Sequence, residues 1–161
     1  MKKGIIITII ILIAITASSF IFWVIPQEIP QTLVVSDFEN YLDRAKKIHE
    51  TLQESTEDEF QNLLTGKTSP EDYIAISDIT SSQVTAQISE FVTTKPPEEW
   101  QGSYISHMEA LKKFNSYVIE TKVFANMIKN NNTDTEILQK IDVLKSESHE
   151  LLKKSDSLRP K

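Results

Sequence analysis

The sequence predicts an all-α protein, in which one N-terminal transmembrane helix is followed by an extracytoplasmic up-down four-helix bundle. Three observations carry this prediction. Residues 4–25 form an apolar run without a single charge. Beyond this run, apolar residues recur at spacings of three and four, as they do along one face of a helix. Helix start and stop signals then divide this pattern into four segments.

The apolar run GIIITIIILIAITASSFIFWVI, residues 4–25, predicts a membrane anchor. A helix of this length spans roughly 33 Å, which matches a hydrocarbon core of about 30 Å. Trp23 falls where interfacial aromatic residues belong, and Pro26 follows as a helix stop. We therefore expect the chain to contact the lipid bilayer through residues 4–25.

A cleaved signal peptide is the alternative for the same segment. Lys2 and Lys3 would be its basic start, and residues 17–19, Ala-Ser-Ser, its cleavage site, so that residues 1–19 would be removed. The apolar run continues through residues 20–25, which favours a retained anchor. Both interpretations leave residues 1–3 in the cytoplasm and place the following domain outside it. The protein is thus expected in the cell membrane as a single-pass protein, or secreted if it is cleaved.

Composition excludes several classes of function. The chain has no cysteine, which removes disulfide frameworks, thiolate metal sites and cysteine nucleophiles. All 23 Asp and Glu follow the anchor, against 15 Lys and Arg, so the remainder of the chain carries a net charge of −8. Such a surface repels phosphate backbones, and nucleic-acid binding is not expected.

The first bundle helix is predicted at about 37–65, within a domain of residues 36–161. Residues 26–35 form a proline-containing linker before it. Ser36 and Glu39 match a capping box, in which the two side chains satisfy each other's backbone amides. Gly66 supplies the C-terminal stop.

The second helix is predicted at about 70–94, with Ser69 as its N-cap, Pro70 as its first residue and residues 95–97, Lys-Pro-Pro, at its end. This segment is rich in Ser, Thr and Ile, so a strand is the alternative. Because its apolar residues do not alternate strictly and the segment is long, a helix is favoured.

Two further helices complete the predicted bundle. The third, at about 97–130, has Glu98 and Glu99 in its first turn, where the helix dipole favours acids. The fourth, at about 134–158, follows a second capping box at residues 133–136 and repeats its apolar residues every seven positions. An extended two- or three-helix coiled coil that dimerises is the alternative architecture.

Three histidines are the only candidates for metal or proton chemistry at neutral pH. His49, His107 and His149 fall at similar heights along their predicted helices, an arrangement that would suit zinc or copper if their faces converged. His107 lies on an apolar stripe, whereas His49 and His149 lie one position beside theirs and are expected to face solvent. We therefore assign no catalytic residue, metal ligand or cofactor.

Two other groups have both a structural and a functional interpretation. The aromatic residues of the third helix are expected in the core, with a ligand pocket as the alternative; they are Trp100, Tyr104, Phe114 and Tyr117. Asn131 begins the triplet Asn-Asn-Thr, which is an N-glycosylation sequon in an exported domain. Its alternative is an asparagine-rich turn between helices.

These observations favour a non-enzymatic interaction or accessory module that binds a partner protein or forms a homo-oligomer. The alternative is an exported domain that binds a small ligand or a metal, for sensing or delivery. Glycine loops that cradle phosphates and nucleophile motifs are missing from the sequence, so an enzyme is not expected.

Overall fold

The computed structural model describes residues 37–132 and 135–160, which form four α-helices and no strand. These are α2 (Phe38–Leu64), α3 (Pro70–Thr93), α4 (Glu98–Lys129) and α5 (Glu136–Ser157). The chain divides into two units, residues 1–31 and 32–161, and every described helix belongs to the second. The predicted tail, anchor, cleavage site and linker lie outside the described residues. Within the described part, none of the helices is both long and apolar enough to cross a membrane.

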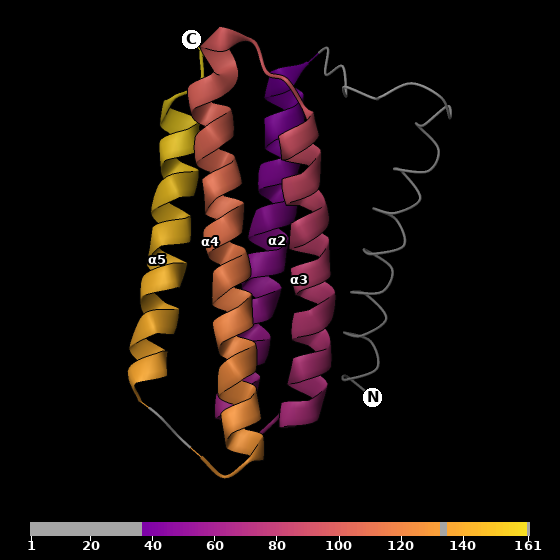
Figure 1. Ribbon diagram of the computed structural model, residues 1–161, viewed down its shortest axis with the longest axis vertical. Coiled ribbons are helices and arrows are strands. Elements are labelled where there is room, and N and C mark those ends of the chain that lie inside the picture. Colours follow the sequence, from indigo (N-terminus) through magenta and orange to yellow (C-terminus); the bar gives the residue numbers. More distant parts are fainter. Residues whose placement is uncertain (1–36, 133–134, 161) are drawn as a thin grey trace, which may run out of the picture. The chain divides into compact units, whose positions relative to one another are not determined.

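The four helices run alternately up and down, and each is antiparallel to the next along the chain (Figure 1). This confirms the predicted four-helix bundle. Helix α4 packs against both α3 and α5, and α2 completes the bundle beside α3. The observed helix bounds differ from the predicted ones by two residues or fewer. The strand alternative for the second segment is wrong, because residues 70–93 are helical throughout.

The helix ends show which local signals operate. Ser69 caps α3 as predicted, since its hydroxyl accepts a hydrogen bond from the Asp72 amide at 3.2 Å. The N-cap of α2 is Asp37 rather than Ser36, because the Asp37 carboxylate already accepts the Asn40 amide at 3.0 Å. Helix α5 begins at Glu136, and its N-cap residue Thr135 makes no side-chain cap hydrogen bond. The second predicted capping box begins at Thr133, which lies outside the described residues.

Helices α2 and α4 end in the same way. Gly66 adopts a left-handed φ of 70°, and the amides of Gly66 and Lys67 bond back to the carbonyls of Leu63 and Asn62 at 3.0 and 2.8 Å. Asn131, with φ of 54°, takes the equivalent position after α4. Both are Schellman motifs, in which a left-handed residue lets the chain satisfy the last free carbonyls of the helix.

The core is packed differently on its two sides. Aromatic rings join α2 to α3, with Tyr41 against Phe91 at 5.5 Å and Phe60 against Tyr73 at 5.8 Å between ring centroids. Between α4 and α5 the contacts are made by small residues instead. Ser148 donates a hydrogen bond to the carbonyl of Ala110 at 2.9 Å. Seven residues along α5, Ser155 donates to the carbonyl of Ser103 at 2.8 Å.

Candidate functional site

A pair of histidines lies in the interior of the bundle. His49 of α2 and His107 of α4 are 0% and 1% exposed, and their ring centroids are 5.8 Å apart. The expectation that His49 faces solvent is wrong. Leu42, His49 and Thr56 recur every seven residues and are all buried, so this core-facing row of α2 is partly polar. A sequence pattern that counts only apolar residues as buried does not identify His49 and Thr56 as core positions.

Aromatic rings enclose the histidine pair. His49 stacks on Phe114 of α4 with centroids 5.1 Å apart and an interplanar angle of 28°. His107 stacks on Phe91 of α3 at 5.0 Å and 27°. Three helices therefore supply the rings, and α5 supplies the one polar contact described next.

The hydrogen bonds indicate the tautomer of His49. Ser148 has one hydroxyl hydrogen, and it already donates it to the Ala110 carbonyl. The 3.4 Å contact between Ser148 Oγ and His49 Nε2 therefore has the imidazole N–H as its donor. His49 Nδ1 then carries a lone pair, and it is buried without a hydrogen-bond partner in the described part of the chain.

Burial keeps both rings neutral at physiological pH. It lowers the pKa of His49 to about 4, with the nearby charge of His149 as a further cause. It lowers the pKa of His107 to about 3, and the neighbouring His49, Arg159 and Lys46 act in the same direction. The groups outside the pair that act on it, His149, Arg159 and Lys46, are all basic, so none of them offsets the cost of protonation. The pair is built to remain uncharged.

The three histidines do not converge. His149 is exposed on α5, whereas the other two are enclosed. Among residues 37–132 and 135–160, no three His, Cys, Asp or Glu side chains are grouped closely enough to hold a metal ion.

The aromatic residues of α4 largely fill the core. Tyr104, Phe114 and Tyr117 are buried, which confirms the core interpretation for these three. Trp100 is half-buried and stacks against Phe38 at the end of the bundle, 6.4 Å between centroids. Tyr104 lies 4.4 Å from Phe91, and burial raises the pKa of its hydroxyl.

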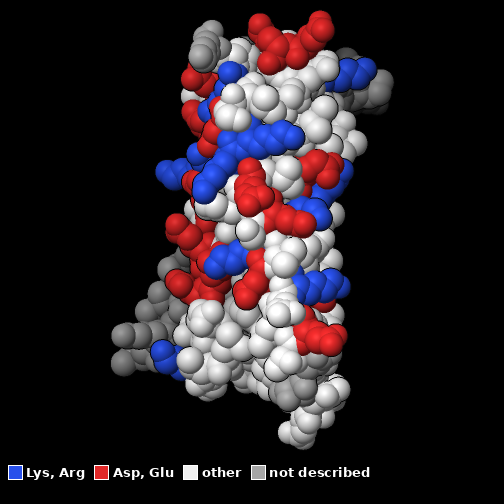
Figure 2. Space-filling model, turned by 90° about the vertical axis from the view of Figure 1, so that its left-hand side faces the viewer, with Lys and Arg blue, Asp and Glu red and all other residues white. Residues whose placement is uncertain are grey.

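Ion pairs connect the helices on the α5 side of the bundle. Figure 2 shows this face, with acidic and basic side chains intermixed over it. Lys145 of α5 pairs with Glu57 of α2 at 2.7 Å, and Lys113 of α4 pairs with Glu147 of α5 at 2.7 Å. Acidic and basic side chains on this face therefore lie next to each other, and neither sign of charge forms a continuous patch.

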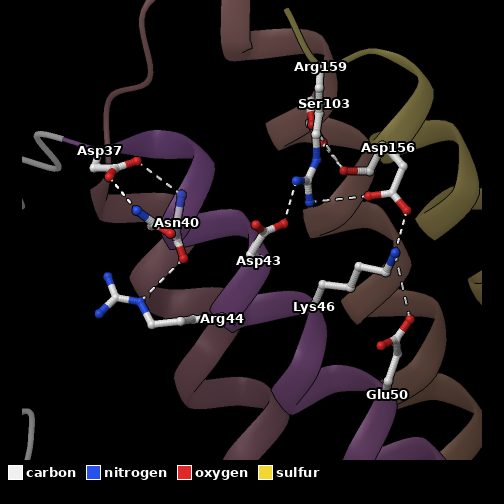
Figure 3. A network of polar contacts seen from close by, with 10 residues as sticks. Asp37, Asn40, Asp43, Arg44, Lys46, Glu50, Ser103, Asp156 and Arg159 are labelled. Atoms are coloured by element: carbon white, nitrogen blue, oxygen red, sulfur yellow. Dashed lines mark hydrogen bonds and ion pairs between the residues drawn. The ribbon is translucent and has the colours of Figure 1, made fainter.

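A polar network joins the beginning of α2 to the end of α5 (Figure 3). Arg159 pairs with Asp43 at 2.5 Å and with Asp156 at 3.2 Å. Asp156 also accepts Lys46 at 2.6 Å, and Lys46 lies 3.8 Å from Glu50. Sequence reasoning did not find this network, because its partners are more than a hundred residues apart and leave no periodic signal.

Asn131, the candidate glycosylation residue, is exposed immediately after α4. Its left-handed backbone serves the Schellman motif described above, so the residue has a structural role whether or not it is modified. Thr133, the last residue of the sequon, lies outside the described residues.

Comparisons with protein-family models, with curated proteins and with solved structures found no match to this chain.

Proposed function

We propose that this protein is a non-enzymatic, single-pass membrane protein whose helical bundle lies outside the cytoplasm and binds another protein chain. The apolar run of residues 4–25 supports the anchor, and Lys2 and Lys3 before it support the orientation. The bundle itself supports a binding role over a catalytic one, because its most strongly shifted histidines are sealed in the core.

The observation that carries the binding role is a row of exposed apolar side chains on α4. Ile105, Ile119 and Val123 are 53%, 46% and 42% exposed. Their spacings of fourteen and four residues put them on one outward face of the helix. Ile119 and Val123 are adjacent on this face, and Lys112, which pairs with Glu109, lies between them and Ile105. Exposed apolar side chains aligned on one face are typical of a surface that another protein covers.

Crosslinking in membranes tests this proposal. Two differently tagged copies of the full chain are coexpressed, crosslinked and recovered through one tag. We expect a stoichiometric partner, either the second tagged copy or another protein. Replacing Ile119 and Val123 together by Glu should remove it, because burying a carboxylate in the contact is costly.

The matched control is Val143→Glu, which places the same charge on an exposed apolar position of α5. It should leave the partner in place. Recovery of the tagged chain alone, with no other protein and no second copy, would contradict the proposal.

The alternative of an exported metal- or ligand-binding domain rests on the histidines. Equilibrium dialysis of the full chain in mild detergent against zinc and copper, with wild type and His107→Ala compared, decides it. Binding of one metal per chain that is lost in the variant would replace the leading proposal.

Modification at Asn131 is a further part of this proposal. It requires the exported location, and it predicts a mass decrease when the native protein is treated with a glycosidase. An unchanged mass after treatment, in protein from a host that glycosylates asparagine, would contradict it.

A further inference from the structure

The histidine pair lies where α2 meets the rest of the bundle. His49 belongs to α2, and the rings of His107 and Phe114 of α4 lie 5.8 and 5.1 Å from it between centroids. Phe91 of α3 stacks on His107 at 5.0 Å. The two imidazoles therefore cover each other across the contact between α2 and α4, and both would reach water if α2 moved away.

The hydrogen bonds of the pair have no place for an added proton. His49 Nδ1 and His107 Nε2 are buried without a hydrogen-bond partner in the described part of the chain. Protonation of His49 would turn the lone pair of Nδ1 into an N–H donor with no acceptor. A buried donor without an acceptor, and a buried charge without a counter-charge, both cost free energy. The closed bundle therefore resists protonation of the pair.

Basic groups surround the pair on the side of α5. They are His149 of α5, Arg159 beyond its end and Lys46 of α2. Arg159 and Lys46 both pair with the carboxylate of Asp156, at 3.2 and 2.6 Å. This carboxylate therefore neutralises two cations of the surface rather than an imidazolium in the core.

The acidic residues next to the pair in sequence also have other neighbours. Glu50 lies by Lys46, Glu147 by Lys113, and Glu90 by Tyr41 and Arg44. From α3 the pair is contacted by Phe91, which carries no charge. No carboxylate thus acts on either ring among the groups that set their pKa values.

Three ion pairs hold α2 to the end and middle of α5. Asp43 pairs with Arg159 at 2.5 Å, Lys46 with Asp156 at 2.6 Å and Glu57 with Lys145 at 2.7 Å. Figure 3 shows the first two of them. Each pair contains one carboxylate, so its attraction ends when that carboxylate is protonated.

The other three helices are also joined by neutral hydrogen bonds. Ser148 of α5 donates to the carbonyl of Ala110 in α4 at 2.9 Å. Ser81 of α3 donates to the side-chain oxygen of Asn115 in α4 at 2.8 Å. Hydroxyl and amide groups do not change charge in acid, so these bonds between α3, α4 and α5 persist when the contacts of α2 weaken.

We propose that α2 is an acid-released helix: protonation of His49 and His107 frees it from a three-helix unit formed by α3, α4 and α5. Release uncovers the aromatic side chains that α2 packs against, among them Phe91 and Tyr73 of α3. The change takes place in the core and does not involve the exposed row on α4. It is therefore independent of the proposed function.

The pKa values set the size of the effect. A histidine exposed by release titrates near about 6.5, whereas the pKa values in the closed bundle are about 4 and about 3. The closed form is therefore favoured in full above the higher value and loses its advantage as pH falls. Between pH 8 and pH 5 each histidine shifts the ratio of released to closed chains by about thirtyfold, and the two together by about a thousandfold.

Amide hydrogen exchange of the full chain in mild detergent locates the opening. Rates at pH 8 and pH 5 are corrected for the intrinsic pH dependence of exchange. We expect the protection of the α2 amides to fall about a thousandfold, and to be at least tenfold below that of the α4 amides at pH 5. Unchanged protection of α2, or equal protection of all four helices at pH 5, would overturn the proposal.

Substitution of each histidine tests its share. His49→Gln and His107→Gln should each reduce the thousandfold change in α2 to about thirtyfold, because one titrating group remains. The matched control is His149→Gln, which alters an exposed histidine of α5 and should keep the full change. A full change in both core variants would overturn the role of the pair.

Thiol labelling gives a second measurement that leaves the histidines intact. The chain has no cysteine, so Ala45→Cys on the buried side of α2 and Ala110→Cys at the contact of α4 with α5 each introduce one thiol. A pyridyl disulfide, which reacts with thiols in acid, should label Cys at position 45 at least tenfold faster than at position 110 at pH 5. Equal rates would mean that the bundle opens as a whole and would overturn the release of α2.

Discussion

At the scale of single residues, His49 and His107 make the stability of the bundle depend on pH. A histidine whose pKa is lowered by folding binds its proton more readily in the unfolded chain. The stability it contributes is complete above its unfolded pKa of about 6.5, and it is lost as pH falls towards the folded value. For these two residues the folded values are about 4 and about 3.

We therefore expect the free energy of unfolding to fall between pH 6.5 and pH 4. Each histidine contributes at most about 1.4 kcal/mol per pH unit, because one unit of pKa difference corresponds to that energy. Urea unfolding at a series of pH values measures the slope. The His49→Gln, His107→Gln double variant should have a shallower slope between pH 7 and 5, and the exposed His149→Gln should not. Equal slopes in all three proteins would contradict the assignment.

Two glycines provide an opposite pair of residue-scale tests. Gly66 has a left-handed φ of 70°, so Gly66→Ala should destabilise the bundle by about 1 kcal/mol. Gly102 is an interior residue of α4, and a methyl group there would meet Leu158 at ordinary contact distance. Gly102→Ala should stabilise by about 0.5–1 kcal/mol through helix propensity. Thermal or urea unfolding measures the change in stability of each variant. A change in the same direction for both variants would contradict these roles.

At the scale of elements, the helix contacts depend on side-chain size. Helices α4 and α5 meet through small residues whose hydroxyls bond the facing backbone, while α2 and α3 meet through aromatic rings. A close contact of the first kind has no room for a larger side chain.

Ser148→Leu should therefore destabilise the bundle by about 1–3 kcal/mol, through overpacking and loss of the bond to Ala110. The nearby exposed Ser146→Leu should change the stability by less than about 0.5 kcal/mol. Urea unfolding at neutral pH compares the two variants. Equal effects would mean that the α4–α5 contact is looser than described.

Much of the element scale could be predicted from sequence, because helix starts, stops and apolar spacing are local signals. Ser69, Pro70 and Gly66 marked their boundaries correctly. The N-cap of α2 was misplaced by one residue because Ser36 and Asp37 are both good caps. His49 and Arg159 could not be placed, since their surroundings come from distant helices and from polar residues that no apolar pattern records.

At the scale of the whole molecule, retention or cleavage of the apolar run at residues 4–25 decides whether the bundle is attached to the membrane. We expect the native protein to stay in the membrane after an alkaline carbonate wash and, once treated with a glycosidase, to have the full chain mass of 18.4 kDa. The reason is that the apolar run continues past the candidate cleavage site at residues 17–19. Intact-mass measurement on purified membranes checks this. A mass equal to that of a chain beginning at Phe20 would instead show that the protein is cleaved and secreted.

The network around Arg159 also sets an order of assembly. The beginning of α2 supplies Lys46 and Asp43. The partner of Lys46 is Asp156, 110 residues further along the chain, and the partner of Asp43 is Arg159, 116 residues further. At synthesis rates of about 5–20 residues per second, α2 waits roughly 5 to 25 seconds for these partners. Until Asp156 and Arg159 have been synthesised, Lys46 and Asp43 lack the partners that join them to the end of α5. The bundle therefore closes at this end only after Asp156 and Arg159 have been synthesised. A chain that lacks residues 156–161 would keep most of α5 but lose the ion pairs that join the beginning of α2 to the end of α5.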